Sequence, residues 1–353
     1  MLLNEVRFLD ITTVRYSPVD RVLILLLLLV NLGACLGNAF LIYLFCTDKK
    51  LRNPATYLVL NLAIIDLCLG SVNAFCFFAP NLITGKFYLG FVGGQINGYA
   101  EVMFCGASLI NLGLLGFDRW LVIVRNYRIS TKQAFYLAAL SWVWGIILAS
   151  VPFWFGNHHI LEYSRLYFAG DWSNQSPGGL VMTIGCLFTV SMPLLWFTYS
   201  YAQILHVVRQ NNRQWAQLQQ HGRGKDRKLS VKPDQRSLKD LKAAQLEAAI
   251  AKRSAIVVGV FVINWLFYLV NFLAELTTGR QFNGTLDTFA VFGAHLNSFF
   301  NPDADDISKE SGATTSTHRS ANLSWVPPAS RTSIASTAVK STPSPVMEAC
   351  TNV

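Results

Sequence analysis

Seven stretches of the sequence are apolar over about the length that a helix needs to cross a lipid bilayer. A bilayer core of about 30 Å is spanned by about 20 apolar residues in a helix. Only 14% of the residues are charged, against roughly a quarter in soluble domains. We therefore expect an all-α membrane protein, a bundle of seven transmembrane helices, over residues 22–46, 56–78, 96–124, 135–155, 180–207, 255–274 and 286–302.

The basic residues are shared unevenly among the segments that connect these stretches. Three follow the first stretch, three follow the third and twelve lie between residues 209 and 253, whereas the other connections carry one each, Lys86, Arg165 and Arg280. Because loops rich in Lys and Arg stay on the cytoplasmic side, we expect residues 1–20 outside and the loop 208–247 in the cytoplasm. The net charge of +9 then reflects orientation in a membrane, which we expect to be the plasma membrane, and not nucleic-acid binding.

Two further features concern the predicted outside loops. The N-x-[ST] sequons at Asn174 and Asn283 fall in them and are candidate glycosylation sites. Six of the seven cysteines lie in apolar stretches, and Cys350 lies near the end of the chain. We therefore expect no disulfide framework in the outside loops.

Polar residues recur inside the predicted spans, where they usually face the interior of the bundle. For a single Asn or Ser, hydrogen bonding between helices is the simplest interpretation, but a mid-span carboxylate such as Asp66 needs a partner, a proton or a cation. Several motifs follow one another in order, one or more on each span: Gly37-Asn38, KKLRNPATYLVLNLAIIDL ending at residue 67, Asp118-Arg119-Trp120, Trp142 with Pro152, Pro193 with Tyr201, Phe261 with Trp265, and NSFFNP from Asn297 to Pro302.

This ordered set resembles the rhodopsin-like (class A) G-protein-coupled receptors over about residues 20 to 302, and its second motif resembles animal opsins. The resemblance implies a non-enzymatic receptor that passes an extracellular stimulus to a heterotrimeric G protein through outward movement of the sixth helix. It implies that Arg119, beside Asp118, pairs with Glu247 in the resting state; the alternative is that Asp118 and Arg119 only mark the membrane interface. The remaining residues of the implied activation switch are Leu109, Pro193, Tyr201 and Phe261.

The resemblance also implies a sodium site around Asp66. Carboxylate, hydroxyl and amide oxygens suit a hard cation, and Trp265 is expected above the site. The alternative is a polar network that holds water and no ion. The residues of this network are Asn38, Asp66, Ser108, Asn297, Ser298 and Asn301.

The expected ligand pocket departs from that of opsins. Opsins bind retinal through a Lys six residues before the Asn of the Asn-Pro motif, and His295 stands at that position. Imidazole forms no stable Schiff base, so we expect no covalent retinal and no other organic cofactor. Asn97 takes the opsin counterion position, and Glu101 lies one helical turn further in.

We expect Glu101 and His295 to pair across a pocket that also contains Asn97, Trp265 and Tyr268. The pair either binds a small polar or cationic ligand or acts as an internal lock. Two other functions stay open: a degenerate or non-covalent photoreceptor, and, less favoured because no inverted repeats are seen, a transporter.

Two more departures from the family affect the helix bundle. The family's disulfide would start at Gly94 and is missing, so the second outside loop is either loose or held by packing of Tyr167, Phe168 and Trp172. Phe267 replaces the Pro that kinks the sixth helix in the family, which leaves the amplitude of its movement open.

After the receptor domain, residues 21–303, the sequence is rich in Ser, Thr, Ala and Pro. Such a segment cannot bury a core, and we expect residues 304–353 to form a disordered cytoplasmic tail. Asp305 stands where the family has Tyr. A wrong exon boundary in the gene model, which we favour, and a genuine truncation both explain this; in a genuine tail, phosphorylated Ser and Thr would recruit an arrestin-like partner.

Overall fold

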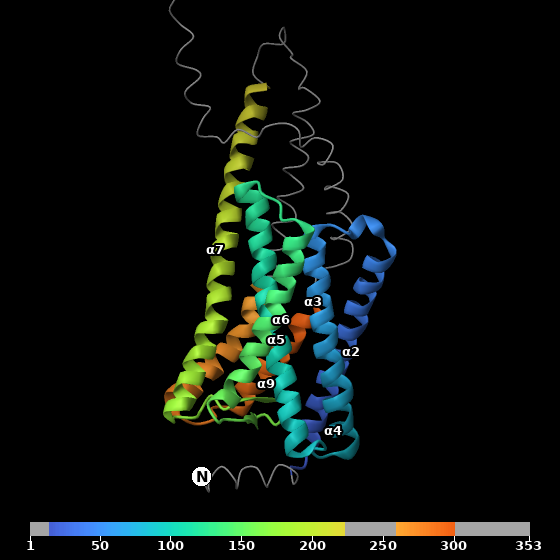
Figure 1. Cartoon of the computed structure of the whole chain (residues 1–353), viewed down its shortest axis with the longest axis vertical. Helices are drawn as coiled ribbons and strands as arrows, with labels where there is room; N and C mark the ends of the chain where they lie inside the picture. Colours follow the sequence, from blue (N-terminus) through green and yellow to red (C-terminus); the bar gives the residue numbers. More distant parts are fainter. Residues whose placement is uncertain (1–13, 223–258, 301–353) are drawn as a thin grey trace, which may run out of the picture. The chain divides into compact units, whose positions relative to one another are not determined.

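The computed structural model describes residues 14–222 and 259–300. The predicted Glu247 and Asn301, the tail 304–353 and most of the loop 208–247 lie outside these ranges. The described residues belong to one compact unit. Its long helices (Figure 1) are α2 (Pro18–Thr47), α3 (Pro54–Ser71), α5 (Gly90–Arg125), α6 (Thr131–Trp154), α7 (Pro177–Gly222), the helix Gly259–Thr278 and α9 (Gly284–Phe299).

Side-chain caps fix where several of these helices begin. At the start of α2, the Ser17 hydroxyl accepts a hydrogen bond from the Asp20 amide (3.2 Å), and the Asp20 carboxylate accepts one from the Ser17 amide (2.9 Å). Ser130 and Gln133 repeat this arrangement at the start of α6. Each cap satisfies backbone donors that the first helical turn leaves without partners.

The described part of each predicted apolar stretch is almost entirely helical, with three differences in extent. The second continues from α3 through a π-helical turn, η3 (Val72–Phe78), into α4 (Ala79–Thr84). The fifth runs on to Gly222, so the first part of the predicted loop 208–247 is helical. Six described helices are long and apolar enough to cross a membrane, whereas α9, with 16 described residues, is shorter than that length.

The outward faces of the helices carry many large apolar side chains. Large exposed side chains include Leu36 (74% exposed), Tyr136 (75%) and Phe188 (65%). A helix that is apolar all round is typical of a membrane span. The helices therefore form a multi-pass membrane bundle in which α5 packs against α3, α6 and α7.

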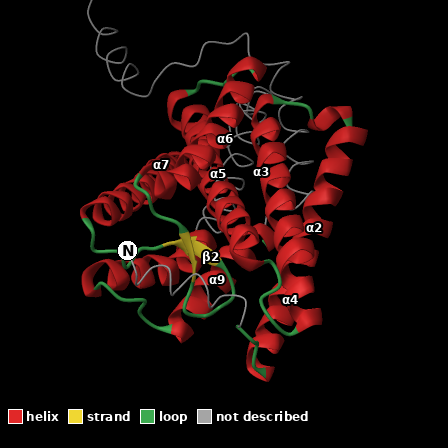
Figure 2. Ribbon diagram, turned by 60° about the horizontal axis from the view of Figure 1, so that its bottom comes forward, coloured by secondary structure: helices red, strands yellow, loops and turns green. Residues whose placement is uncertain are grey.

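A short hairpin crosses one end of the bundle, which we call the hairpin end. Strand β1 (His159–Leu161) pairs antiparallel with β2 (Phe168–Gly170), which is labelled in Figure 2. In this pairing His159 lies opposite Gly170. Glycines of α5 let it approach, since a methyl group on Gly94 would lie 2.6 Å from the Phe168 ring.

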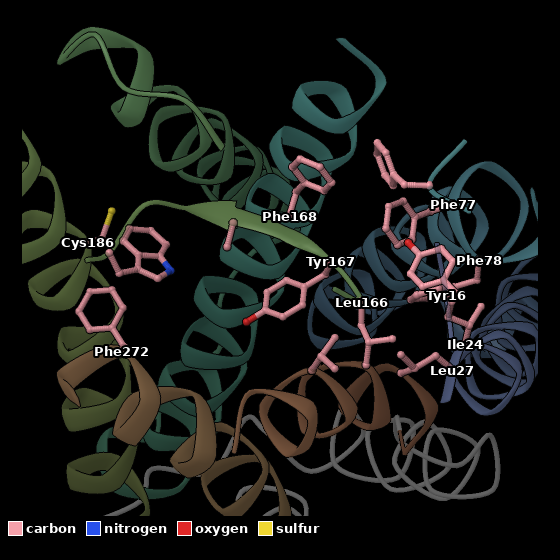
Figure 3. Close-up of a cluster of buried hydrophobic side chains, with 14 of the residues drawn as sticks. Tyr16, Ile24, Leu27, Phe77, Phe78, Leu166, Tyr167, Phe168, Cys186 and Phe272 are labelled. Atoms are coloured by element: carbon pink, nitrogen blue, oxygen red, sulfur yellow. The ribbon is translucent and has the colours of Figure 1, made fainter. Parts of the chain in front are cut away.

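The largest hydrophobic core cluster lies beneath this hairpin. Leu166, Tyr167 and Phe168 point into it from the hairpin side, and Phe77 and Phe78 enter it from η3 (Figure 3). Trp172 is buried in the same cluster. Of the two predicted states of the loop, the structure therefore has the packed one. The hairpin itself did not emerge from the sequence.

Candidate functional site

A cavity opens below the hairpin, between α5, α7, α9 and the helix Gly259–Thr278. It encloses about 870 Å³ of space free of protein atoms, including the part that opens outward. Most lining residues are aliphatic or aromatic. Among the described residues that line it, Glu101 is the only charged one, with polar atoms also supplied by Tyr167, Tyr268, Trp172, Trp265, Cys105 and Cys186.

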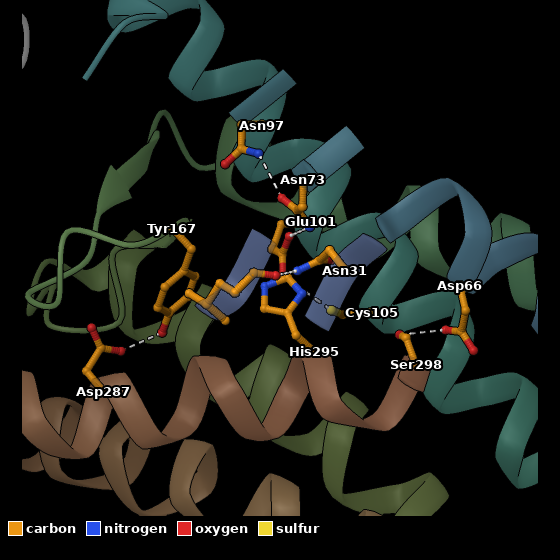
Figure 4. A network of polar contacts seen from close by, with 11 residues as sticks. Asn31, Asp66, Asn73, Asn97, Glu101, Cys105, Tyr167, Asp287, His295 and Ser298 are labelled. Carbon is orange, nitrogen blue, oxygen red and sulfur yellow. Dashed lines mark hydrogen bonds and ion pairs between the residues drawn. The ribbon is translucent and has the colours of Figure 1, made fainter. Parts of the chain in front are cut away.

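The carboxylate of Glu101 lies at the centre of a buried polar group (Figure 4). Its Oε1 is 3.6 Å from Nε2 of His295. Its Oε2 accepts a 2.6 Å hydrogen bond from the Asn73 amide, and Asn97 in turn donates to the Asn73 oxygen (3.2 Å). The Cys105 thiol donates to Glu101 Oε1 at 3.7 Å.

The structure therefore brings Glu101, His295 and Asn97 together, but it does not place all three at the cavity. Glu101, Trp265 and Tyr268 line the cavity, whereas Asn97 and His295 are not among its lining residues. His295 is 1% exposed, and its ring packs edge-on against Phe78. We conclude that His295 contacts Glu101 directly, and Asn97 contacts its partner Asn73, from outside the cavity lining.

Sequence reasoning missed Asn73, which joins this group from η3. A π-helical turn holds one more residue per turn than an α-helix and so redirects the side chains that follow it. The signal in the sequence was an Asn inside the apolar run VNAFCFF, at a depth where polar side chains usually have a partner.

Aromatic side chains connect the cavity to the middle of the bundle. The Trp265 ring contacts Tyr268 (centroids 5.4 Å apart) above and Phe261 (5.9 Å) below. Leu109 lines the same cavity as Trp265 and is 3% exposed. Pro193 lies about one turn below, where a methyl group on Gly113 would be 3.7 Å from its Cβ. The predicted connector residues thus lie at successive depths between the cavity and the other end of the bundle.

The predicted polar network around Asp66 is assembled in part, through Asn38, Ser108 and Ser298. Oδ1 of Asp66 accepts hydrogen bonds from Ser298 (3.0 Å) and Ser108 (3.4 Å). Asn38 donates to the backbone carbonyl of Ser298 (3.0 Å). Asn297 is engaged elsewhere, since its side-chain oxygen accepts from Asn264 (3.0 Å).

The donor set fits a hard cation only in part. Asp66 supplies a carboxylate, and Ser108 and Ser298 supply hydroxyls that already point at it. No cluster of three or more His, Cys, Asp or Glu with metal-binding geometry occurs within residues 14–222 and 259–300. The site therefore fits a weakly held monovalent ion better than a structural metal.

At the end of α5 opposite the hairpin, Arg119 pairs with its neighbour in sequence. Its Nη2 lies 3.4 Å from Oδ2 of Asp118, which is buried. Tyr201 packs against Phe197 (4.8 Å between centroids) in a cluster that includes Trp120. Arg125 lies over the Trp120 ring, 5.1 Å from its centroid. The pairing of Arg119 with Glu247 involves a residue outside the described ranges.

The hairpin is tied to α9 by polar contacts. The Tyr167 hydroxyl donates a 2.6 Å hydrogen bond to Asp287, and the Ser164 amide donates to its other oxygen (2.9 Å). Burial raises the pKa of Tyr167 well above its usual range, so it stays a donor. These bonds hold the hairpin over the cavity, and all six cysteines in the described part of the chain are free thiols.

The two sequons differ in their surroundings. The side-chain amide nitrogen of Asn174, which a glycan would modify, donates to Asn157 (2.8 Å). Asn283 is exposed and uses its oxygen to cap α9, accepting from the Thr285 and Leu286 amides. Asn283 therefore has the more available nitrogen.

The comparisons with known proteins agree with this architecture. A family model described as "7 transmembrane receptor (rhodopsin family)" matches residues 37–303. Melanopsin of Homo sapiens is 29% identical over 248 residues, which cover 69% of this chain and 49% of melanopsin. The lateral eye opsin of Limulus polyphemus is 27% identical over 290 residues, 78% of this chain and 72% of that opsin. The chain thus spans about half the length of the melanopsin that it matches.

A solved structure shows the same fold. The crystal structure of squid rhodopsin superposes with a TM-score of 0.70 at 21% sequence identity, over 92% of this chain and 94% of that chain.

Proposed function

Because the chain belongs to the rhodopsin family of seven-transmembrane receptors, we propose that it is a receptor for a small molecule and acts on a heterotrimeric G protein. The observation that carries this proposal is the cavity, which has one carboxylate, Glu101, in an otherwise mostly apolar lining. Such a lining favours a largely apolar ligand with one cationic or hydrogen-bond-donating group. The lining thus refines the ligand class expected from the sequence, a small polar or cationic molecule, to one that is largely apolar apart from this group.

The alternative role of the Glu101–His295 pair, an internal lock on the resting state, involves the same residues. The Glu101 carboxylate and the His295 imidazole lie 3.6 Å apart without a hydrogen bond of standard length, so a ligand donor competes with His295 for Glu101. In this proposal, ligand binding weakens the contact between α5 and α9. The contact is then both the resting lock and the ligand's anchor.

The hairpin end is the outside in this proposal, as the distribution of Lys and Arg predicts. The N-terminus is then outside and the Arg119 end faces the G protein in the cytoplasm of a cell with the receptor in its plasma membrane. A glycan at Asn283, or less readily at Asn174, would mark the outside face. An endoglycosidase-sensitive mobility shift that disappears in Asn283→Gln supports this orientation; a shift from a sequon introduced beside Arg128 would contradict it.

We propose that activation passes from the cavity along the stacked side chains of Trp265 and Phe261 toward the Arg119 end of the bundle. Displacement at Glu101 shifts Trp265 and Phe261, and the helix Gly259–Thr278 moves outward at its far end, freeing Arg119 from Glu247. Packed interiors change between discrete arrangements and do not deform continuously. Phosphorylated tail residues would then recruit an arrestin-like partner.

A signalling assay with a library of apolar amines and alcohols tests the proposal. We expect hits whose half-maximal concentration rises at least about tenfold in Glu101→Gln, equivalent to about 1.4 kcal/mol. Arg119→Ala is the control that binds ligand but does not signal. An unchanged response of Glu101→Gln, with no change in basal activity, would exclude both the ligand-anchor and the lock roles of Glu101.

A second candidate is a photoreceptor that holds retinal without a covalent bond. The similarity to melanopsin and the Limulus opsin and the apolar cavity favour it. The residues present do not fit covalent retinal, because His295 takes the place of the lysine and α9 contains no lysine. Purification with 11-cis-retinal decides between the candidates: a visible absorbance band that bleaches in light supports the photoreceptor, and a spectrum of free retinal contradicts it.

A further inference from the structure

Three carboxylates are buried at the hairpin end, each on a different element. Glu162 follows β1, Glu275 lies in the last turn of Gly259–Thr278, and Asp287 lies in the first turn of α9. Their exposed fractions are 1%, 1% and 0%. The ion pairs of the described residues do not involve any of them. Three negative charges buried without a cation would repel one another strongly, so protons must reside in the group.

The hydrogen bonds indicate where the protons are. Both oxygens of Asp287 accept short hydrogen bonds, from Tyr167 and from the Ser164 amide, which favours the ionised form. Glu275 accepts on Oε1 only, from Asn271 (3.1 Å) and the Phe282 amide (3.4 Å). No hydrogen bond of standard length reaches either oxygen of Glu162 or Oε2 of Glu275. The charge is therefore on Asp287, and Glu162 and Glu275 hold protons.

Other titratable groups around the three carboxylates do not supply a counterion. Asp171 of the loop after β2 adds a further negative charge, and the neighbouring phenols of Tyr167 and Tyr268 carry no positive charge. Arg165 and Arg280 are exposed. Burial raises the pKa of Glu162 well above its usual range, the charges of Asp287, Glu275 and Asp171 raise it further, and the nearby Gln281 amide lowers it in part.

We propose that Glu162, Glu275 and Asp287 form a proton-loaded latch that fastens the hairpin to the ends of the helix Gly259–Thr278 and α9. Loss of the protons puts like charges on three elements at once and pushes them apart. The latch reaches the cavity directly, because Tyr167 both lines the cavity and donates to Asp287. The pH of the medium at the hairpin end thus sets how firmly the roof of the cavity is held.

The direction of the effect follows from proton linkage. The folded protein keeps protons on Glu162 and Glu275 that the unfolded chain loses above about pH 4.3, the ordinary pKa of Glu. The stabilisation is therefore complete at acidic pH and is lost as pH rises through the raised pKa of Glu162 in the folded protein. Acidification closes the latch, and alkaline medium opens it.

Thermal unfolding of the purified full chain in detergent micelles tests the latch without any G protein or ligand. We expect Tm to fall by about 3 °C or more between pH 5 and pH 8.5. Glu162→Gln with Glu275→Gln imitates the protonated state, so its Tm should stay nearly constant over this range. The control Asp171→Asn removes a less buried carboxylate of the same loop. Its Tm should still decrease between pH 5 and pH 8.5 by most of the wild-type amount.

A wild-type Tm that is flat or rises with pH would overturn the proposal, as would a fall of wild-type size in the double variant. If the double variant fails to fold, a second measurement on the wild type still tests the proposal. The infrared absorption of protonated carboxyl groups should be present at pH 5 and shrink by pH 8.5. Absence of that absorption at pH 5 would also overturn the latch. Because neither measurement involves signalling, their outcome is independent of the proposed function.

Discussion

Asn73 and Glu101 share the shortest hydrogen bond of the buried polar group, 2.6 Å, between η3 and α5. A carboxylate in an apolar bundle is stable only when donors compensate for the water it lost. Asn73 supplies a neutral donor. The imidazole of His295 lies nearby but makes no hydrogen bond of standard length, so an ionised or neutral ligand can compete with it for Glu101. The chemistry of this cavity thus depends on a residue that does not line it.

At the residue scale, Asn73→Leu should destabilise the protein by about 1–3 kcal/mol, because the Glu101 carboxylate loses its strongest donor and stays buried. Thermal unfolding in micelles measures this loss. In a double-mutant cycle with Glu101→Leu, the two losses should be far from additive, since both substitutions remove the Asn73–Glu101 hydrogen bond. Additive losses would show that Asn73 stabilises the bundle by some other contact.

At the scale of elements, the hairpin depends on glycines of α5. Gly98 lies under His159 and Phe168, and a methyl group there would be 2.7 Å from His159 Cβ. Contacts this short would push the hairpin away from α5. The hairpin would then cover the cavity less completely. Sequence patterns could not reveal the hairpin, because strands of three residues are too short for a period-two signal.

Gly98→Ala should therefore destabilise the protein by about 1–3 kcal/mol through overpacking. The matched control is Gly37→Ala in α2, where no atom lies within 4 Å of the added methyl group. That control should leave Tm unchanged or raise it slightly, because Ala favours helix more than Gly does. Equal effects of the two substitutions would contradict the close packing of the hairpin on α5.

Much of the arrangement of the helices was predicted from the sequence. Hydropathy predicted every long helix, since a bilayer span must be both apolar and about 20 residues long. The polar residues Asp66, Ser108 and Ser298 were predicted to meet, and they do. The positions of Asn97 and His295 outside the cavity lining were not predicted, because which face of a helix borders a cavity depends on the packing of all its neighbours and on the π turn at Val72–Phe78.

At the scale of the whole molecule, the Asp66 network links α2, α3, α5 and α9. An ion bound there would stabilise this arrangement by mass action. We therefore propose that sodium raises Tm of the purified protein relative to choline at equal ionic strength, and that Asp66→Asn abolishes the difference. Equal Tm values in sodium and choline for the wild type would favour the alternative, a network that holds water.

The free cysteines of the described chain have a consequence for handling this protein. Its hairpin is fastened by side-chain packing and by the bonds of Asp287 to Tyr167 and Ser164, all of which form without an oxidant. Folding then needs no oxidising compartment or isomerase at the hairpin, and a thiol reductant in the buffer should leave the cavity intact. A host whose secretory pathway forms disulfides poorly is accordingly a suitable source of the protein.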